Sequence, residues 1–181
     1  MGIKYSLRNI AAVQNKKVFF DANILIYLFW PSGAKDWEDK YASIFGEIIR
    51  QQNELFVDFI VISEIINRAI HIEHEKYCKL NNIIKNDLPF KKYRDSRNGQ
   101  DALSDIHLIV ETNILDKFTV IGKAFTEAEI QSFLIVNTLD FADKGILLTC
   151  KENACVLLTN DTDYTMADID ILTCHPAILR N

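Results

Sequence analysis

Several features that mark other protein classes are scarce or missing in this chain of 181 residues. Three prolines and six glycines are too few for long flexible linkers. The sequence has no glycine-rich phosphate loop and no dinucleotide-binding fingerprint, which argues against enzymes that depend on those motifs. None of the four cysteines forms a CxxC pair, so neither a zinc knuckle nor a thioredoxin-type motif is indicated. Any chemistry must therefore come from other residue types.

Long apolar runs are missing as well. The first apolar stretch, 18–30, is interrupted by Asp21 and Asn23 and is too short to span a bilayer. The first nine residues lack the continuous apolar core of a signal peptide. Because the cysteines are expected to be reduced, mostly buried thiols, we expect a cytoplasmic protein with no membrane segment.

An excess of basic charge is also lacking, since the formal net charge is −5. Proteins that bind nucleic acids usually present a basic surface, so the charge by itself counts against a nuclease. Acids that bind metal ions contribute negative charge, however, and bound divalent cations reverse the local field. The charge is therefore compatible with a nuclease that depends on a metal ion.

The sequence does contain an alternation of strand and helix patterns, in a length that suits one domain over residues 1–181. Apolar runs predict strands at 17–20, 55–59, 118–121 and 155–159, with a last edge strand at 170–173. Predicted helices begin near residues 24, 36, 63, 101, 126 and 138, with Ser63 as an N-cap and Thr126 and Glu129 forming a capping box. This alternation predicts an α/β fold with a central, mainly parallel sheet of four or five strands.

Acidic residues stand where these elements meet. Asp21 and Asp161 each follow a predicted strand directly, and parallel sheets bind ligands at the carboxyl ends of their strands. Glu64 and Asp143 lie in the first turns of predicted helices. Taken singly, each acid is more simply a helix cap, a turn former or a surface acid. Taken together they would meet at one rim, where a hard cation such as Mg²⁺ or Mn²⁺ would offset their repulsion.

Four segments carry a more specific pattern: 18–26, 62–65, 139–143 and 156–164. The first is a strand that ends in Asp21 and is followed two residues later by the polar Asn23. The last is a Thr-x-Asp-x-Asp-aromatic signature from Thr159 to Tyr164. In this order and spacing the segments resemble the PIN domains, including the VapC-type ribonuclease toxins. Residues about 75–117 match no element of that family and form a less typical helical and loop section.

The resemblance implies a three-layer α/β/α PIN-like fold and a hydrolase activity, namely an endoribonuclease that depends on Mg²⁺ or Mn²⁺. It implies metal-binding and catalytic roles for four acids: Asp21, Glu64, Asp143 and Asp161. Asp163 would be an auxiliary metal-binding acid, and Asn23 and Thr159 would orient the carboxylates through hydrogen bonds. Asp140, on the same helix face as Asp143, is an alternative ligand, but the 18 residues between Asp143 and Asp161 match the family interval.

The densest basic run lies in 87–101, which Pro89 and Asn98-Gly99 predict to be a loop. Its candidate RNA-binding residues are Lys91, Lys92, Tyr93, Arg94 and Arg97. The cations would contact phosphates, and the tyrosine ring would stack on an unpaired base. The simpler alternative is a solvated loop surface without a ligand.

Three functions remain open. The first is the toxin of a toxin–antitoxin pair, for which the resemblance implies an antitoxin protein, an RNA substrate and a homodimer. The second is an RNA-processing PIN nuclease that is not a toxin. The third is a catalytically silent PIN-like scaffold that binds a protein or RNA, although the intact acids speak against it. Growth arrest on expression, relieved by a neighbouring gene product, would separate the first from the second.

Overall fold

The computed structural model describes residues 2–30 and 33–180, and its centre is one sheet of parallel strands. Within the described residues the sheet has six strands, in the order β1-β6-β5-β2-β3-β4. Their bounds are β1 (Lys4–Tyr5), β2 (Lys17–Phe20), β3 (Leu55–Val57), β4 (Thr119–Val120), β5 (Cys155–Leu158) and β6 (Ile171–Leu172). The predicted α/β class with a parallel sheet is confirmed, with more strands than the four or five expected.

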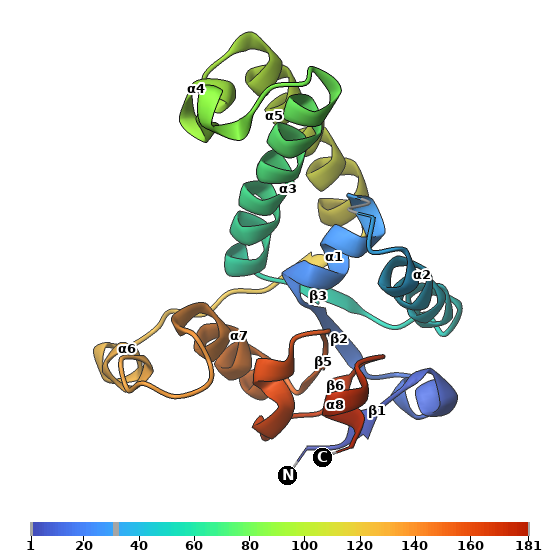
Figure 1. Cartoon of the computed structure of the whole chain (residues 1–181). Helices are drawn as coiled ribbons and strands as arrows, with labels where there is room; N and C mark the ends of the chain where they lie inside the picture. The colour runs from blue at the N-terminus through green and yellow to red at the C-terminus, as the bar shows by residue number, and fades with distance from the viewer. Residues whose placement is uncertain (1, 31–32, 181) are drawn as a thin grey trace.

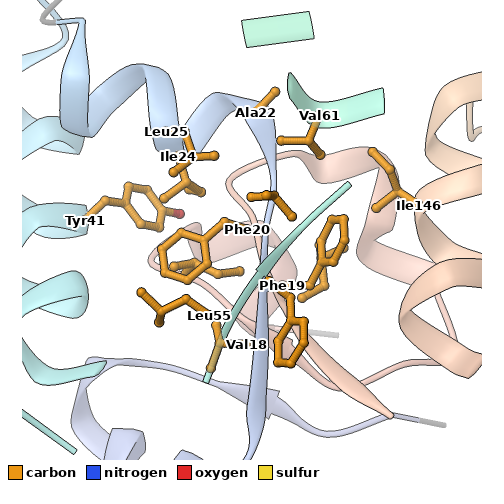
Figure 2. Packing of buried hydrophobic residues seen from close by; sticks show 14 of the residues in the cluster. Val18, Phe19, Phe20, Ala22, Ile24, Leu25, Tyr41, Leu55, Val61 and Ile146 are labelled. Carbon is orange, nitrogen blue, oxygen red and sulfur yellow. The ribbon is translucent and has the colours of Figure 1, made fainter. Parts of the chain in front are cut away.

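Helices cover both faces of this sheet, which explains why its central strands are apolar on both sides. The α-helices are α1 (Ala22–Phe29), α2 (Lys35–Arg50), α3 (Phe59–Leu80), α4 (Phe90–Arg94), α5 (Arg97–Ile109), α6 (Glu127–Phe133), α7 (Phe141–Glu152) and α8 (Pro176–Leu179). Shorter segments are the 3₁₀ helices η1 (Leu7–Val13), η2 (Lys85–Asp87) and η4 (Thr162–Met166) and the π-helix η3 (Val110–Leu115). Tyr41 of α2 and Ile146 of α7 pack from opposite sides of the central strands (Figure 2). Phe20 meets Phe45 of α2 edge-on, with ring centroids 5.9 Å apart. Each such buried side chain stabilises the fold by about 1.5–3 kcal/mol.

Helix α3 projects away from the sheet, and α4 lies at its far end (Figure 1). Helix α5 then packs back against α3. This projection contains most of the 75–117 section, so the part of the chain that matched no family element forms a distinct region. None of the helices in the described residues has the length and apolar character needed to cross a membrane.

The start of α3 differs from the sequence prediction. A strand was expected to reach residue 59, with Ser63 capping the next helix, but the helix begins at Phe59. Its N-cap is Asp58, whose Oδ1 accepts a hydrogen bond of 2.9 Å from the backbone N–H of Val61. The apolar residues after Asp58 are β-branched and resemble a strand, yet the cap turns them into helix at the sheet rim. Glu64 therefore lies in the second turn of α3.

Three other predictions are corrected. The segment 87–101 is not a loop, because it contains α4 and the first turn of α5, which Ser96 caps through the backbone N–H of Gly99. The predicted last edge strand is β6, which lies inside the sheet because β1 pairs with its outer side. Helix α7 starts at Phe141 with Asp140 as N-cap, a few residues later than expected. The capping box of Thr126 and Glu129 is confirmed.

The order of the strands places the candidate acids. Strand β2 pairs with β5 on one side and with β3 on the other, so the chain leaves β2 at a point where the strand order reverses. Phe20 and Leu158 are partners at the ends of β2 and β5. The residues that follow them, Asp21 and Thr159, therefore emerge side by side at the carboxyl edge, where open α/β sheets bind ligands.

Candidate metal and catalytic site

Asp21 is the centre of the site. It is the N-cap of α1 and is only 5% exposed. One carboxylate oxygen accepts a hydrogen bond of 2.7 Å from the backbone N–H of Ala22. The other accepts hydrogen bonds from Asn23 Nδ2 at 2.7 Å and from Thr159 Oγ1 at 2.5 Å. Three donors thus hold a buried carboxylate in one orientation.

Asn23 and Thr159 also connect Asp21 to the end of β5. The Asn23 Oδ1 accepts a hydrogen bond of 3.2 Å from the backbone N–H of Asn160. The Thr159 Oγ1 accepts one of 2.9 Å from the backbone N–H of Asp161. These contacts join loops that are about 140 residues apart in sequence and fix the Asp161 backbone beside Asp21. Both residues donate hydrogen bonds to the Asp21 carboxylate, and their role in orienting a metal ligand stays a prediction.

The electrostatics of Asp21 are unusual for an aspartate. Burial raises its pKa to about 7, and the nearby charges of Glu64 and Asp143 raise it as well. The hydrogen bonds from Thr159 and from the Ala22 backbone act in the opposite direction but do not compensate. The fold therefore disfavours the charged form of Asp21, and a cation bound at this position would favour that form.

Asp143, half-buried in the first turn of α7, also has a raised pKa. Burial raises its pKa to about 6, helped by the charges of Asp140 and Asp161, while a hydrogen bond from Tyr164 lowers it. That bond runs from the Tyr164 hydroxyl to Asp143 Oδ1 and measures 2.7 Å. The charge of Asp143 raises the pKa of Asp21, and the charge of Asp161 raises the pKa of Asp143. Asp143 therefore lies within electrostatic range of both Asp21 and Asp161.

Asp140 and Asp163 have other primary contacts. Asp140 is exposed and uses Oδ1 to accept a hydrogen bond of 2.8 Å from the Asp143 backbone, so its role is that of a helix cap. Asp161 caps η4 through the backbone N–H of Asp163 at 3.0 Å. Asp163 itself is exposed on that turn, and it is not among the charges that raise the pKa of Asp21 or Asp143.

Glu64 is the acid with a basic partner. Arg68, one turn later on α3, donates a hydrogen bond of 3.1 Å to Glu64 Oε1. Both side chains are about two-fifths exposed, and exposed pairs of this spacing contribute only about 0.3–0.5 kcal/mol. Arg68 can therefore exchange this partner at little cost. Together with Asn23 and Asp161 it lines a cleft of about 260 Å³ at the carboxyl edge.

The site can be tested for its fit to a divalent ion. Within residues 2–30 and 33–180, no three His, Cys, Asp or Glu side chains already converge tightly enough to enclose a metal. Magnesium, however, usually keeps several waters and takes one or two carboxylates plus substrate phosphate oxygens. The buried Asp21 and the half-buried Asp143 supply such oxygens without a paired cation. The donor set fits a hard, largely hydrated ion.

Lys144 is the basic residue closest in sequence to Asp143, and it does not neutralise the site. It is 8% exposed and donates to the carbonyl oxygens of Phe133 and Ile135, at 2.8 and 2.6 Å. It thereby ties the end of α6 to α7. Neither Lys144 nor Tyr164 has a role that its sequence position alone predicts, since Tyr164 stands out only as the aromatic residue of the last motif.

The basic run 91–97 lies elsewhere. It belongs to α4 and the start of α5, at the end of the projection remote from the sheet (Figure 1). Tyr93 is 3% exposed, because its ring packs against His74 and Tyr77 of α3. The expected stacking of Tyr93 on an RNA base is therefore wrong for this structure. Lys91, Lys92 and Arg97 remain exposed and Arg94 is half-buried.

A parallel α/β sheet with acids at the switch point of its carboxyl edge defines a class of α/β proteins whose ligand site lies at that edge. Comparison with known proteins then specifies the family: the PIN domain model matches residues 18–172, and the chain belongs to the PIN domain family. PIN domains are generally nucleases. The resemblance inferred from the four sequence segments is thereby confirmed.

One solved structure illustrates the fold. The crystal structure of FitAcB from Neisseria gonorrhoeae superposes with a TM-score of 0.53 and 15% sequence identity. The similarity covers 86% of this chain and 96% of the FitAcB chain. At that identity the likeness supports the fold alone. No curated protein sequence matches the chain.

Proposed function

We propose that this protein is an endoribonuclease that hydrolyses RNA phosphodiester bonds with the help of Mg²⁺ or Mn²⁺. The observation that carries the proposal is Asp21, a buried carboxylate whose pKa is raised to about 7 by burial and by Glu64 and Asp143. At neutral pH such a group does not stabilise the fold, because burial opposes its ionisation. A site that binds a cation does need it.

Asp21 and Asp143 would hold the ion directly, with Glu64 and Asp161 completing its surroundings through carboxylate oxygens or water. When bound, the ion supplies an activated water at neutral pH and stabilises charge that develops on the phosphate. Thr159 and Asn23 keep the Asp21 carboxylate oriented, since each donates a hydrogen bond to it. Tyr164 does the same for Asp143.

Arg68 would contact the RNA substrate and not the metal ion. It stands beside Glu64 at the edge of the cleft, with its side chain 44% exposed. A guanidinium there can form a bidentate contact with an RNA phosphate and lead the strand toward the acids. No nucleophile from the protein is required in this arrangement.

The proposal is tested by incubating single-stranded RNA with the purified protein and Mn²⁺. The wild type should cleave, chelation should stop cleavage, and Asp143→Asn should abolish it. Asp39→Asn, which neutralises an exposed aspartate on α2, is the matched control and should keep full activity. Binding of Mn²⁺ measured directly by calorimetry should fail for Asp143→Asn. A wild type that neither binds Mn²⁺ nor cleaves RNA would refute the proposed activity.

We further propose that this nuclease is a cytoplasmic toxin controlled by an antitoxin protein. The resemblance of its motifs to VapC-type toxins supports this, and so does an exposed apolar segment between α6 and α7. Leu134, Ile135 and Val136 are 67%, 66% and 95% exposed. Consecutive exposed apolar residues of this kind mark protein contacts. Expression should arrest growth, and co-expression of the neighbouring gene should relieve it. Growth without arrest would favour an RNA-processing nuclease instead.

The homodimer that the resemblance implies remains a proposal with a simple test. Light scattering on the purified protein should give twice the mass of the chain if two copies associate. A mass of 20.8 kDa would show a monomer.

A further inference from the structure

The charge of this protein is distributed very unevenly. Residues 76–97, which form the end of α3, the turn after it and α4, contain seven of the 20 Lys and Arg residues. The same segment has two of the 25 Asp and Glu residues. It therefore carries a net charge of +5 in a chain whose total is −5. We call this segment the basic tip, and it lies at the outer end of the projection (Figure 1).

Several cations of the basic tip are already paired. Lys76 contacts Glu73, Lys85 contacts Glu75, and Arg94 contacts Asp95, at 2.9, 2.6 and 2.9 Å. Lys91 and Lys92 differ from these, because both are exposed and neither forms an ion pair with a described residue. These two ammonium groups are therefore available to an anionic ligand.

Helix α4 packs at the outer end of a stripe of residues on α3 that begins at Glu64. Glu64, Arg68, His71 and Glu75 are spaced by four, three and four residues, so they form one stripe along α3. His71 stacks on Phe90, the first residue of α4, with ring centroids 3.7 Å apart. This contact seats α4, and with it Lys91 and Lys92, at the outer end of the stripe that begins at Glu64.

The tip is also held rigidly. The buried Tyr93 packs between His74 and Tyr77, with centroid distances of 5.0 and 5.2 Å. The His74 ring nitrogen makes a hydrogen bond of 2.9 Å with the Leu88 carbonyl. The burial of Tyr93 thus anchors α4, and with it Lys91 and Lys92, against the outer part of α3. Seven residues of helix separate Glu64 from His71, which is roughly 10 Å at 1.5 Å per residue.

We propose that the basic tip is a docking site for single-stranded RNA, separate from the acids and connected to them along the Glu64–Arg68–His71 stripe. This inference rests on the proposed ribonuclease activity. The separation of roughly 10–16 Å between Glu64 and the stripe positions of His71 and Glu75 corresponds to about three to five nucleotides of a stacked strand, at the duplex rise of about 3.4 Å each. An RNA must therefore extend at least that far beyond the cleaved bond to engage Lys91 and Lys92. The tip makes substrate length a determinant of efficiency.

RNA is a better occupant than an acidic protein segment for a physical reason. The acids at the carboxyl edge repel any polyanion, so a polyanionic substrate needs attraction elsewhere to approach them. The tip provides that attraction in line with the cleft, and Arg68 lies between the two. An acidic peptide would gain from the tip but would meet repulsion along the rest of the stripe.

The test compares Lys91→Ala/Lys92→Ala with Lys35→Ala/Lys151→Ala, which removes the same charge from exposed positions on α2 and α7. With a 12-nucleotide RNA in Mn²⁺, we expect the first variant to raise KM roughly 10-fold, with kcat unchanged and a salt slope smaller by about 1.4. With a trinucleotide, both variants should match the wild type. The control variant should match the wild type on both substrates.

The outcomes separate the two proposals. If the wild type cleaves neither RNA, the proposed activity fails. If it cleaves both but the Lys91/Lys92 variant equals the control on the 12-nucleotide RNA, the docking site is refuted while the activity stands. Equal losses on the trinucleotide would also refute it, because the lysines would then act at the acids themselves. Binding of polyglutamate that depends on the two lysines, with unchanged RNA kinetics, would assign the tip to an acidic protein instead.

Discussion

The two ends of the central strands carry the same kind of side chain in opposite electrostatic states. At the carboxyl edge, Asp21 has a pKa raised to about 7 by burial and by neighbouring acids. At the amino edge, Asp170 has a lowered pKa: burial raises it, but hydrogen bonds from Lys16 and from the Ile3 backbone outweigh that effect. Lys16 lies 2.8 Å from the Asp170 carboxylate. At the amino edge a lysine stabilises the charged aspartate, whereas at the carboxyl edge we expect a bound cation to do so.

The difference separates stability from function. The Lys16–Asp170 contact helps to hold β1 beside β6, because Asp170 also accepts hydrogen bonds from Ile3 and Tyr5. The Asp21 site, by contrast, accumulates acids that destabilise one another in the absence of a cation. A network that costs the folded state free energy persists where it serves binding or catalysis.

Replacing the aspartate at each edge should give opposite results. Asp21→Asn should lower RNA cleavage in Mn²⁺ on the order of 10⁴-fold, the scale seen when one member of a catalytic unit is removed. Asp170→Asn should lower the free energy of unfolding, because Lys16 loses its partner, and leave cleavage unchanged. Cleavage rates and urea unfolding of both variants check the pair. Comparable loss of cleavage in the two variants would contradict the assignment of function to the carboxyl edge.

The pH dependence of stability should come mainly from Asp21. Its folded pKa of about 7 lies above the ordinary aspartate pKa of 3.8, so the folded state holds a proton that the unfolded state releases. The stabilisation is complete below pH 3.8 and is lost as pH rises through 7, on the order of 4 kcal/mol in total. Urea unfolding in chelator at pH 5 to 8 should show this fall. Adding Mn²⁺ at pH 8 should reverse it.

Asp21→Asn serves as the control for that experiment, since an amide cannot titrate. Its unfolding free energy should be nearly flat over the same pH range. A slope equal to that of the wild type would show that other groups, and not Asp21, cause the loss.

The smallest effect should come from the tyrosines that donate to the two edges. Tyr164→Phe removes the hydrogen bond to Asp143, and loss of such a contact to a ligand commonly costs about 10–100-fold in metal affinity. Because that bond lowers the pKa of Asp143, the pH needed for half-maximal Mn²⁺ binding should also rise. Tyr5→Phe, which loses a similar bond to Asp170, is the matched control. It should alter neither quantity, whereas a merely structural Tyr164 would leave the pH profile in place.

Much of the fold and of the site could be predicted from local sequence. The apolar runs at 17–20 and 155–159 form the central strands because both faces of a parallel sheet are buried. The acids after those runs could be placed at one edge, because parallel strands end on the same side. The start of α3 was missed because a single capping residue, Asp58, overrode a β-branched run that favours strand.

Most of the strand and helix alternation, the order of the acids and the family could be inferred from the sequence. Which charges meet could not, because it depends on the folded chain. Tyr164 reaches Asp143, Lys144 turns away to backbone carbonyls, and the predicted RNA-stacking Tyr93 becomes the buried anchor of the basic tip. Local patterns record how one residue relates to neighbours a few positions away. Burial and electrostatic coupling depend on side chains that come together from distant parts of the chain, so they emerge only with the complete fold.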